Sequence, residues 1–293
     1  MRTPIERTST ITTQMYALLF DCCTNYNDYI AWRFPAECPD GNGVCGLDYE
    51  RFNNELTFDI PTLYRDWQGL IAKPSKRYYG DDVDYDQYAL LDLIEFIAQN
   101  CRDISNRIWH GFFGHDDLSF AKTAEVFKEF RKDINAIFGK TGLLYTLTES
   151  GVVERIIEHS VLSIETETAV KQVSEQGTKE LLEEAIVLFK QPNPIVRKSA
   201  VEKIWDALER LKTYYTELDK KSSVIKIVGD MANSQQDFIK LFDDEFRTLT
   251  SIGNDFRIRH HEISKIDITD NRHYDYFFNR CLSLIALAIQ YLR

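Results

Sequence analysis

The stretch GNDFRIRHHEISK gathers side chains that can act on a phosphodiester, between two strongly apolar segments. It holds Arg257, Arg259, His260, His261 and Glu262 within six residues. A guanidinium can grip two phosphate oxygens at once. An imidazole, whose pKa is about 6.5, can accept a proton from an oxygen or return one. Arg257 and His261 are four residues apart, so a helix would place them on one face, about one turn apart.

These residue types suit cleavage of RNA without a metal. The 2′-hydroxyl attacks the neighbouring phosphorus, one side chain removes its proton and another neutralises the oxyanion. From Arg257 to Lys265 three cations stand against one anion, which locally reverses the acidity of the chain. A structural role is the alternative, because Arg and His near helix ends also cap carbonyls or pair with acids such as Asp255 and Asp267.

The overall charge restricts the classes of function. The 293 residues carry a net charge of -11, with a pI of about 5.1. An acidic chain is not a general nucleic-acid coat, because phosphate binding requires Lys and Arg, so RNA would need a local basic site. The sequence has neither an apolar run of about 18 residues nor the apolar core of a signal peptide. We therefore expect a cytoplasmic protein without a membrane span.

Cysteines offer a second kind of chemistry. The six positions are Cys22, Cys23, Cys38, Cys45, Cys101 and Cys281. No CxxC pair occurs and two of the six are adjacent, which favours reduced thiols over a disulfide framework. A zinc site made of Cys38, Cys45, Cys101 and His110 is conceivable, although the spacings do not fit the usual patterns.

A second metal alternative lies in RIWHGFFGHDD, where His110 and His115 precede Asp116 and Asp117. We interpret the spacing as too loose for a metal, and expect these residues to cap a loop or lie on the surface. The sequence thus predicts no metal and no cofactor.

The apolar patterning predicts mostly helices to position these groups. Residues 1–158 are expected to form a helical module with one β-hairpin near 143–157, where LLYTLTESGVVERII switches to β-branched alternation. Residues 159–175 are a connector, and 176–293 form a helical bundle with apolar residues at helical spacing. The predicted fold class is therefore all-α apart from that hairpin.

The bundle resembles a HEPN domain (higher eukaryotes and prokaryotes nucleotide-binding), through NDFRIRHHE as the motif. The helices AVEKIWDALERLKTYY and FIKLFDDEFRTL precede it, and an apolar helix follows. The resemblance implies a metal-independent endoribonuclease that acts as a homodimer, with two motifs facing one cleft. It implies phosphate binding by Arg257 and acid or base catalysis by His261. Supporting or RNA-binding roles are expected at Asn254, Arg259, His260 and Glu262.

The first module resembles the leading module of AbiJ-type abortive-infection proteins of bacteria. The resemblance rests on SNRIWHGFF, FRKDINAIF and the hairpin GLLYTLTESGVVERI. Together the two resemblances cover most of the chain. They imply an antiphage toxin that cleaves tRNA or mRNA after a phage-derived trigger.

The motif departs from the HEPN pattern at two points. The family has four to six residues between its Arg and His, whereas three separate Arg257 from His261 and two separate it from His260. The polar residue after the Arg is replaced by Ile258. These departures keep open a non-catalytic HEPN module that senses a phage protein or nucleotide. An antitoxin-like partner of a separate toxin also remains open.

Overall fold

The computed structural model describes residues 5–41, 43–74, 83–158, 160–258 and 264–292. The chain divides into two compact units, Met1–Ile156 and Ile157–Arg293. We call them the first unit and the second unit and describe each by itself.

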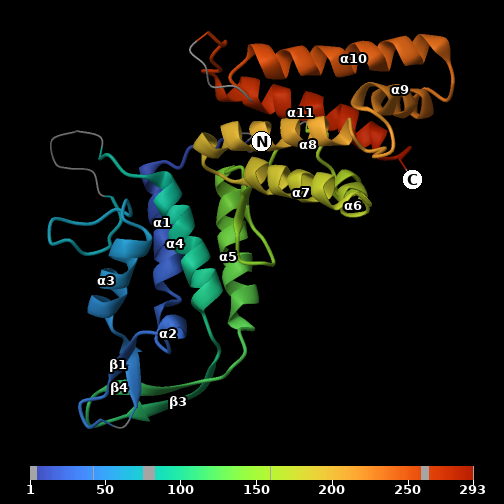
Figure 1. The fold of residues 1–293 in the computed structure, drawn as a ribbon. Coiled ribbons are helices and arrows are strands. Elements are labelled where there is room, and N and C mark those ends of the chain that lie inside the picture. The colour runs from blue at the N-terminus through green and yellow to red at the C-terminus, as the bar shows by residue number, and fades with distance from the viewer. Residues whose placement is uncertain (1–4, 42, 75–82, 159, 259–263, 293) are drawn as a thin grey trace. The chain divides into compact units, whose positions relative to one another are not determined.

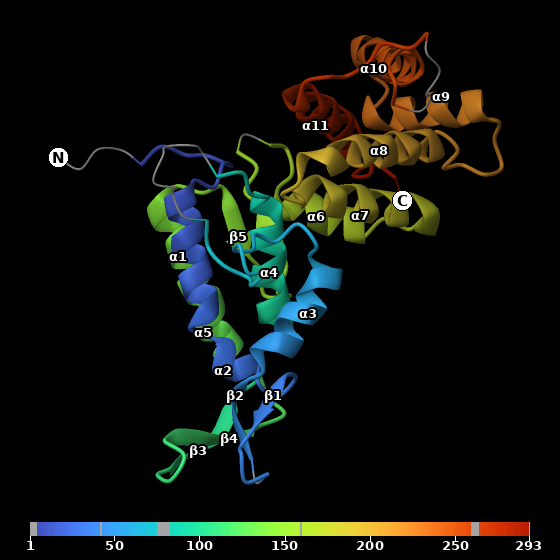
Figure 2. The same cartoon turned by 90° about the vertical axis from the view of Figure 1, so that its left-hand side faces the viewer.

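Helices form the core of the first unit. They are α1 (Thr13–Thr24), α2 (Asn27–Ile30), α3 (Tyr49–Asp59), α4 (Gln87–Asn100) and α5 (Val126–Thr141). Thr12 and Asp86 accept main-chain N–H groups at the starts of α1 and α4, which satisfies donors that a helix start leaves open. The helices α1, α4 and α5 pack together around one apolar core that includes Leu90 and Ile94 (Figure 1, Figure 2).

Two antiparallel sheets belong to the same unit. One has the order β1-β2-β4-β3, and the other pairs β5 with β6. The strands are β1 (Pro35–Glu37), β2 (Val44–Leu47), β3 (Ile104–His110), β4 (His115–Phe120), β5 (Tyr145–Leu147) and β6 (Val153–Arg155). The hairpin predicted near 143–157 is confirmed as β5 and β6. The predicted all-α class is wrong, because the structure is 54% helix and 12% strand, a mixed α/β fold.

The four-stranded sheet was not predicted from the sequence, because the side chains of its strands do not divide into one buried face and one exposed face. A half-buried strand alternates buried and exposed side chains, and that alternation is the sequence signal. In β3 every residue from Ser105 to Trp109 is exposed. Pro35 in β1 and Gly46 in β2 indicated a loop, since both residue types are unfavourable inside strands.

The second unit is built on helices in its described part. They are α6 (Ile164–Lys171), α7 (Gln176–Lys190), a short 3-10 helix (Pro194–Val196), α8 (Arg197–Leu211), α9 (Lys220–Met231), α10 (Gln236–Asp255) and α11 (Asn271–Ala288). The central helix is α8, which packs against both α7 and α11. Trp205 of α8 is completely buried, and the rings of Phe189 and Phe278 stack 3.7 Å apart beside it in the same core. This core supports the ends of α10 and α11, where the predicted site lies.

Candidate functional site

The predicted site lies where α10 ends. Phe256 has an extended backbone, so the chain leaves the helix before Arg257. The Arg257 N–H donates to the Ile266 carbonyl at 2.9 Å, and the Ile266 N–H donates to the Asp255 carbonyl at 3.0 Å. These bonds hold the segment after α10 beside the segment that leads into α11. Main-chain pairing therefore positions Arg257, rather than the helical turn considered from the sequence.

The Arg257 side chain is accessible to solvent. It is 30% exposed, and its Nη1 lies 3.5 Å from Oδ2 of Asp267, whose side chain is 59% exposed. A partly exposed ion pair of this kind contributes little to stability, and a guanidinium binds phosphate oxygens as it binds a carboxylate. The next residue, Ile258, is completely buried in the core of the second unit. Its burial accounts for an apolar residue where the HEPN pattern is polar.

The remaining predicted site residues divide into two groups. Asn254 is exposed in the last turn of α10. Outside the described residues lie Arg259, His260, His261 and Glu262. The structure thus positions the predicted phosphate-binding residue, and the proton-transfer residue is identified by the sequence alone.

A basic groove that the sequence analysis missed lies between α9 and α10, with a volume of about 700 Å³. Its cationic lining consists of Lys212, Lys220, Lys221, Lys240 and Arg247. Apolar side chains that include Val228 and Phe246 complete the walls. The cations come from three separate segments of the chain, and the packing of α9 against α10 brings them together. No local sequence motif therefore predicts the groove.

Two carboxylates offset part of the positive charge of this basic groove. Glu209 accepts hydrogen bonds from Lys212 at 2.5 Å and from Lys220 at 2.7 Å. Asp243 lies 2.8 Å from Arg247. Burial lowers the pKa of Lys212, and the bond to Glu209 opposes that shift. Five cations line the groove, and these two carboxylates neutralise only part of their charge. The groove is therefore positively charged on a chain whose net charge is negative, which suits an anionic ligand.

A second group of reactive side chains meets at the tips of the four-stranded sheet. Cys38 follows β1, His110 ends β3, His115 begins β4, and Asp117 lies two residues further along β4. Their sulfur, nitrogen and oxygen atoms all lie within 4.8 Å of one another. We call these four residues the hairpin-tip cluster. It unites Cys38 of the first metal alternative that the sequence suggested with His115 and Asp117 of the second, and His110 belongs to both.

The other members of those alternatives are placed elsewhere. The Cys45 thiol donates to the Ala36 carbonyl at 3.4 Å within the sheet. Cys101 is buried in the helical core at the end of α4. Asp116 forms an ion pair with Arg107 at 3.1 Å. The sequence contained one usable signal for the cluster, since the four residues between His110 and His115 fall within the usual spacing of zinc-binding histidines.

Comparison with known proteins adds no relative. The chain matches no family model, no curated protein and no solved structure. Across the described residues, the helices are too short or too polar for any of them to cross a membrane.

Proposed function

We propose that the second unit binds RNA in its basic groove and cleaves it with Arg257 and His261, as a HEPN-type endoribonuclease of antiphage defence. The observation that supports this most is the groove, a concentration of cations on an acidic chain. The last residue that lines the groove, Thr250, lies five residues before the end of α10, a rise of about 8 Å. The Arg257 side chain, which is 30% exposed, follows that helix end directly.

The proposed chemistry needs only side chains of this chain. An imidazole of His261 removes the proton from the 2′-hydroxyl, and the 2′-oxygen attacks the phosphorus. Arg257 binds the non-bridging oxygens and offsets the charge that develops on them. The bond to the 5′-oxygen breaks, and that oxygen takes up a proton. The products are a 2′,3′-cyclic phosphate and a 5′-hydroxyl.

The setting of the reaction belongs to the same proposal. The protein acts in the cytoplasm on tRNA or mRNA, and a phage-derived trigger releases its activity. A homodimer places two Arg257–His261 motifs at one cleft.

The chemistry of the products tests the proposal. The purified full chain, or the chain with infected-cell extract as a source of trigger, is incubated with RNA, and the new ends are identified. We expect 2′,3′-cyclic phosphates and 5′-hydroxyls, because the adjacent 2′-oxygen is the nucleophile. A single 2′-deoxy substitution at the main cleavage position should abolish cutting there. Cutting that survives this substitution would refute the mechanism.

A non-catalytic HEPN module is the second candidate. It is favoured by the placement of Arg257 after the helix end and by the burial of Ile258 where the family is polar. RNA that binds to the chain but stays intact, both without and with the infected-cell extract, would support this alternative and reject the nuclease.

Neutralising two lysines of the basic groove should weaken RNA binding. Lys221 and Lys240 line the groove from α9 and α10, and we replace both by glutamine. Affinity for single-stranded RNA should fall roughly tenfold, and the slope of log K against log salt should become shallower by about 1.4, as expected for two lost phosphate contacts. Filter binding over a series of salt concentrations measures both quantities.

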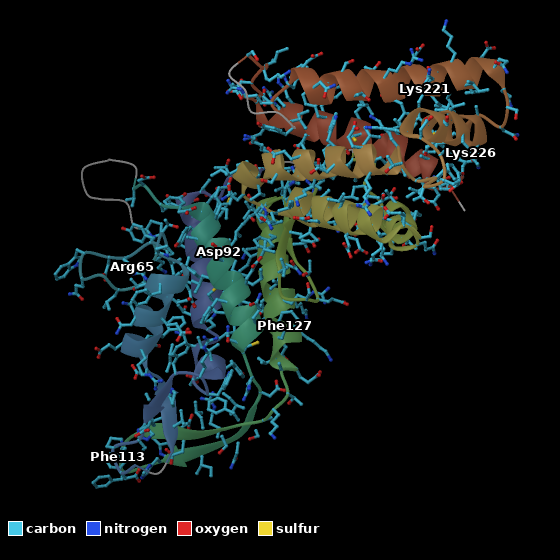
Figure 3. The ribbon with its side chains drawn as sticks, in the orientation of Figure 1. Arg65, Asp92, Phe113, Phe127, Lys221 and Lys226 are labelled. Carbon is cyan, nitrogen blue, oxygen red and sulfur yellow. The ribbon has the colours of Figure 1, made fainter. Side chains whose placement is uncertain are left out.

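Lys226→Gln is the matched control for this pair. Lys226 lies on the same helix as Lys221, and Figure 3 labels both. It faces the Tyr215 ring at 3.8 Å and Asp230 at 3.3 Å, away from the groove lining. The control should leave RNA affinity unchanged. Equal losses in the control and in the double variant would show that the groove is not the binding surface.

A further inference from the structure

The hairpin-tip cluster is assembled by two turns of the sheet. In the first, the Cys38 N–H donates to the Gly43 carbonyl at 2.9 Å, which closes the β1–β2 turn. In the second, the Gly114 N–H donates to the His110 carbonyl at 2.9 Å, which makes His110 and His115 a cross-strand pair. Asp117 lies two residues after His115, so both side chains point to the same face of β4. The turns thus direct four potential ligands to one point.

The distances inside the cluster fit a tetrahedral ion. The Cys38 sulfur lies 3.5 Å from Nδ1 of His110, and that nitrogen lies 3.3 Å from Oδ2 of Asp117. Nε2 of His115 lies 3.4 Å from Oδ1 of Asp117. Zinc bonds of about 2.0–2.3 Å at tetrahedral angles give ligand-to-ligand distances of about 3.3–3.6 Å. Three of the six ligand pairs therefore have the spacing of a zinc coordination shell, and all four ligand atoms lie within 4.8 Å of one another.

Two polar atoms of the cluster have no hydrogen bond within the described part of the chain. They are Nε2 of His115 and Oδ1 of Asp117, and both are inaccessible to solvent. Buried polar atoms nearly always have partners, because leaving one without a partner costs about 1–3 kcal/mol. These two atoms face each other at 3.4 Å, and a cation between them would satisfy both.

The sheet around the cluster has little apolar core of its own. Ile108, Trp109 and Phe112 are 56%, 65% and 87% exposed, and Figure 3 marks Phe113 at the far end of this sheet. The large apolar core of the first unit contains neither Cys38 nor Leu118, although both are buried. Small elements that lack a core are commonly held by a metal or a disulfide. A cross-link at the tips would supply the stabilisation that packing does not.

We propose that Cys38, His110, His115 and Asp117 bind one structural zinc ion that joins the two hairpin tips of the first unit. A thiolate and two imidazoles select zinc over magnesium or calcium, which prefer oxygen ligands. Four protein ligands fill a tetrahedral shell, so the site is structural rather than catalytic.

The surroundings match those of a zinc site beyond its four ligands. Nε2 of His110, the ring nitrogen not directed at the cluster, lies 3.9 Å from a carboxylate oxygen of Asp40. Zinc-binding histidines commonly have such a carboxylate on the opposite side of the ring, where it orients the imidazole. The Phe113 ring lies against both imidazoles, with centroid distances of 4.9 Å to His110 and 5.9 Å to His115. Phe113 thereby shields the ligands on one side.

Metal analysis of the purified full chain tests this proposal. We expect about one zinc per chain after dialysis, and a chelator should lower the thermal unfolding temperature. Cys38→Ser and His115→Gln should each weaken zinc binding in chelator competition by more than about 100-fold. Mutation of a residue that merely hydrogen-bonds to a zinc ligand already lowers metal affinity by about 10–100-fold, and loss of a ligand itself should cost more. Cobalt substitution should give a thiolate-to-cobalt charge-transfer band in the wild type that Cys38→Ser lacks.

Cys45→Ser is the matched control, since Cys45 is a thiol of the same sheet outside the cluster. It should keep the zinc, the chelator effect and the cobalt band. Folded wild-type chain that neither carries nor takes up zinc or cobalt would overturn the proposal. Unchanged zinc affinity in Cys38→Ser would overturn it as well. The site lies in the first unit and the proposed RNA site in the second, so either can fail without the other.

Discussion

Replacing Arg257 or His261 by alanine should reduce RNA cleavage by at least about 100-fold each, the usual scale for loss of a proton-transfer or oxyanion-stabilising group. Arg257→Ala removes the guanidinium that the pairing with Ile266 presents to solvent. His261→Ala removes the proposed base. Cells that express either variant should grow, whereas activated wild type should arrest growth and fragment RNA. Growth curves and the rate of RNA cleavage measure the two effects.

Arg272→Gln and His273→Ala are the matched controls. These residues repeat the same pair of side-chain types at the start of α11. The Arg272 side chain is 88% exposed and paired with Asp270. Both controls should cleave RNA as the wild type does. A His261→Ala variant that remains as toxic and as active as the wild type would end the nuclease proposal.

A lysine variant at position 257 separates the contribution of the positive charge from that of the planar guanidinium. Arg257→Lys keeps the positive charge but loses the planar fork that binds two phosphate oxygens. We expect a rate between those of the wild type and Arg257→Ala. The unfolding midpoints of Arg257→Lys and Arg257→Ala should agree with that of the wild type, because the Arg257 side chain is partly exposed and its ion pair with Asp267 contributes little.

The largest loss of stability is expected from Trp205→Ala. The Trp205 ring is completely buried, and its Nε1–H donates to the Leu249 carbonyl at 2.9 Å. The ring packs edge-on against Phe277, with centroids 6.2 Å apart. It also lies so close to Gly253 that a Cβ built there would approach the ring to 2.5 Å. Trp205 therefore joins α8 to α10 and α11, and its contact with α10 at Gly253 lies four residues before Arg257.

Truncation of this side chain should lower the free energy of unfolding by about 3–5 kcal/mol, since it opens a large cavity. Trp205→Phe is the control. It keeps most of the ring but loses the N–H donor, so a smaller loss of about 1–2 kcal/mol is expected. Denaturant titration followed by circular dichroism measures both variants. Nearly equal stability of Trp205→Ala and wild type would show that the second unit does not depend on this contact.

The elements with a strong local pattern were predictable from the sequence. The helix α4 buries Leu90, Ile94 and Ile97 at helical spacing, so its apolar stripe in the sequence is its buried face. The β5–β6 hairpin was predictable for the same reason, since β-branched residues alternate on both sides of the turn at Gly151. Packing follows such patterns because apolar area removed from water drives folding.

The boundaries of elements were less predictable, because they depend on distant partners. Ser119 and Gly139 are residue types that often begin and end a helix, and they lie near the two ends of the apolar pattern of α5. Instead, Ser119 lies in β4, and the carboxylate of Asp103, far back in the chain, accepts the N–H groups of Glu125 and Val126. The helix ends at Gly142, whose φ of +75° is the left-handed conformation that glycine adopts readily.

The sequence by itself determined the helical periodicity, the cysteine content, the negative charge and the motif that contains Arg257 and His261, because each is a property of composition or of neighbouring residues. Only the tertiary structure decided the mixed α/β class, the basic groove and the hairpin-tip cluster. Cys38 and His110 are 72 residues apart, and their meeting depends on how two hairpins pair in one sheet. Lys221 and Arg247 likewise line one groove because α9 packs against α10. Such sites join residues far apart in the chain, and local spacing carries no information about that distance.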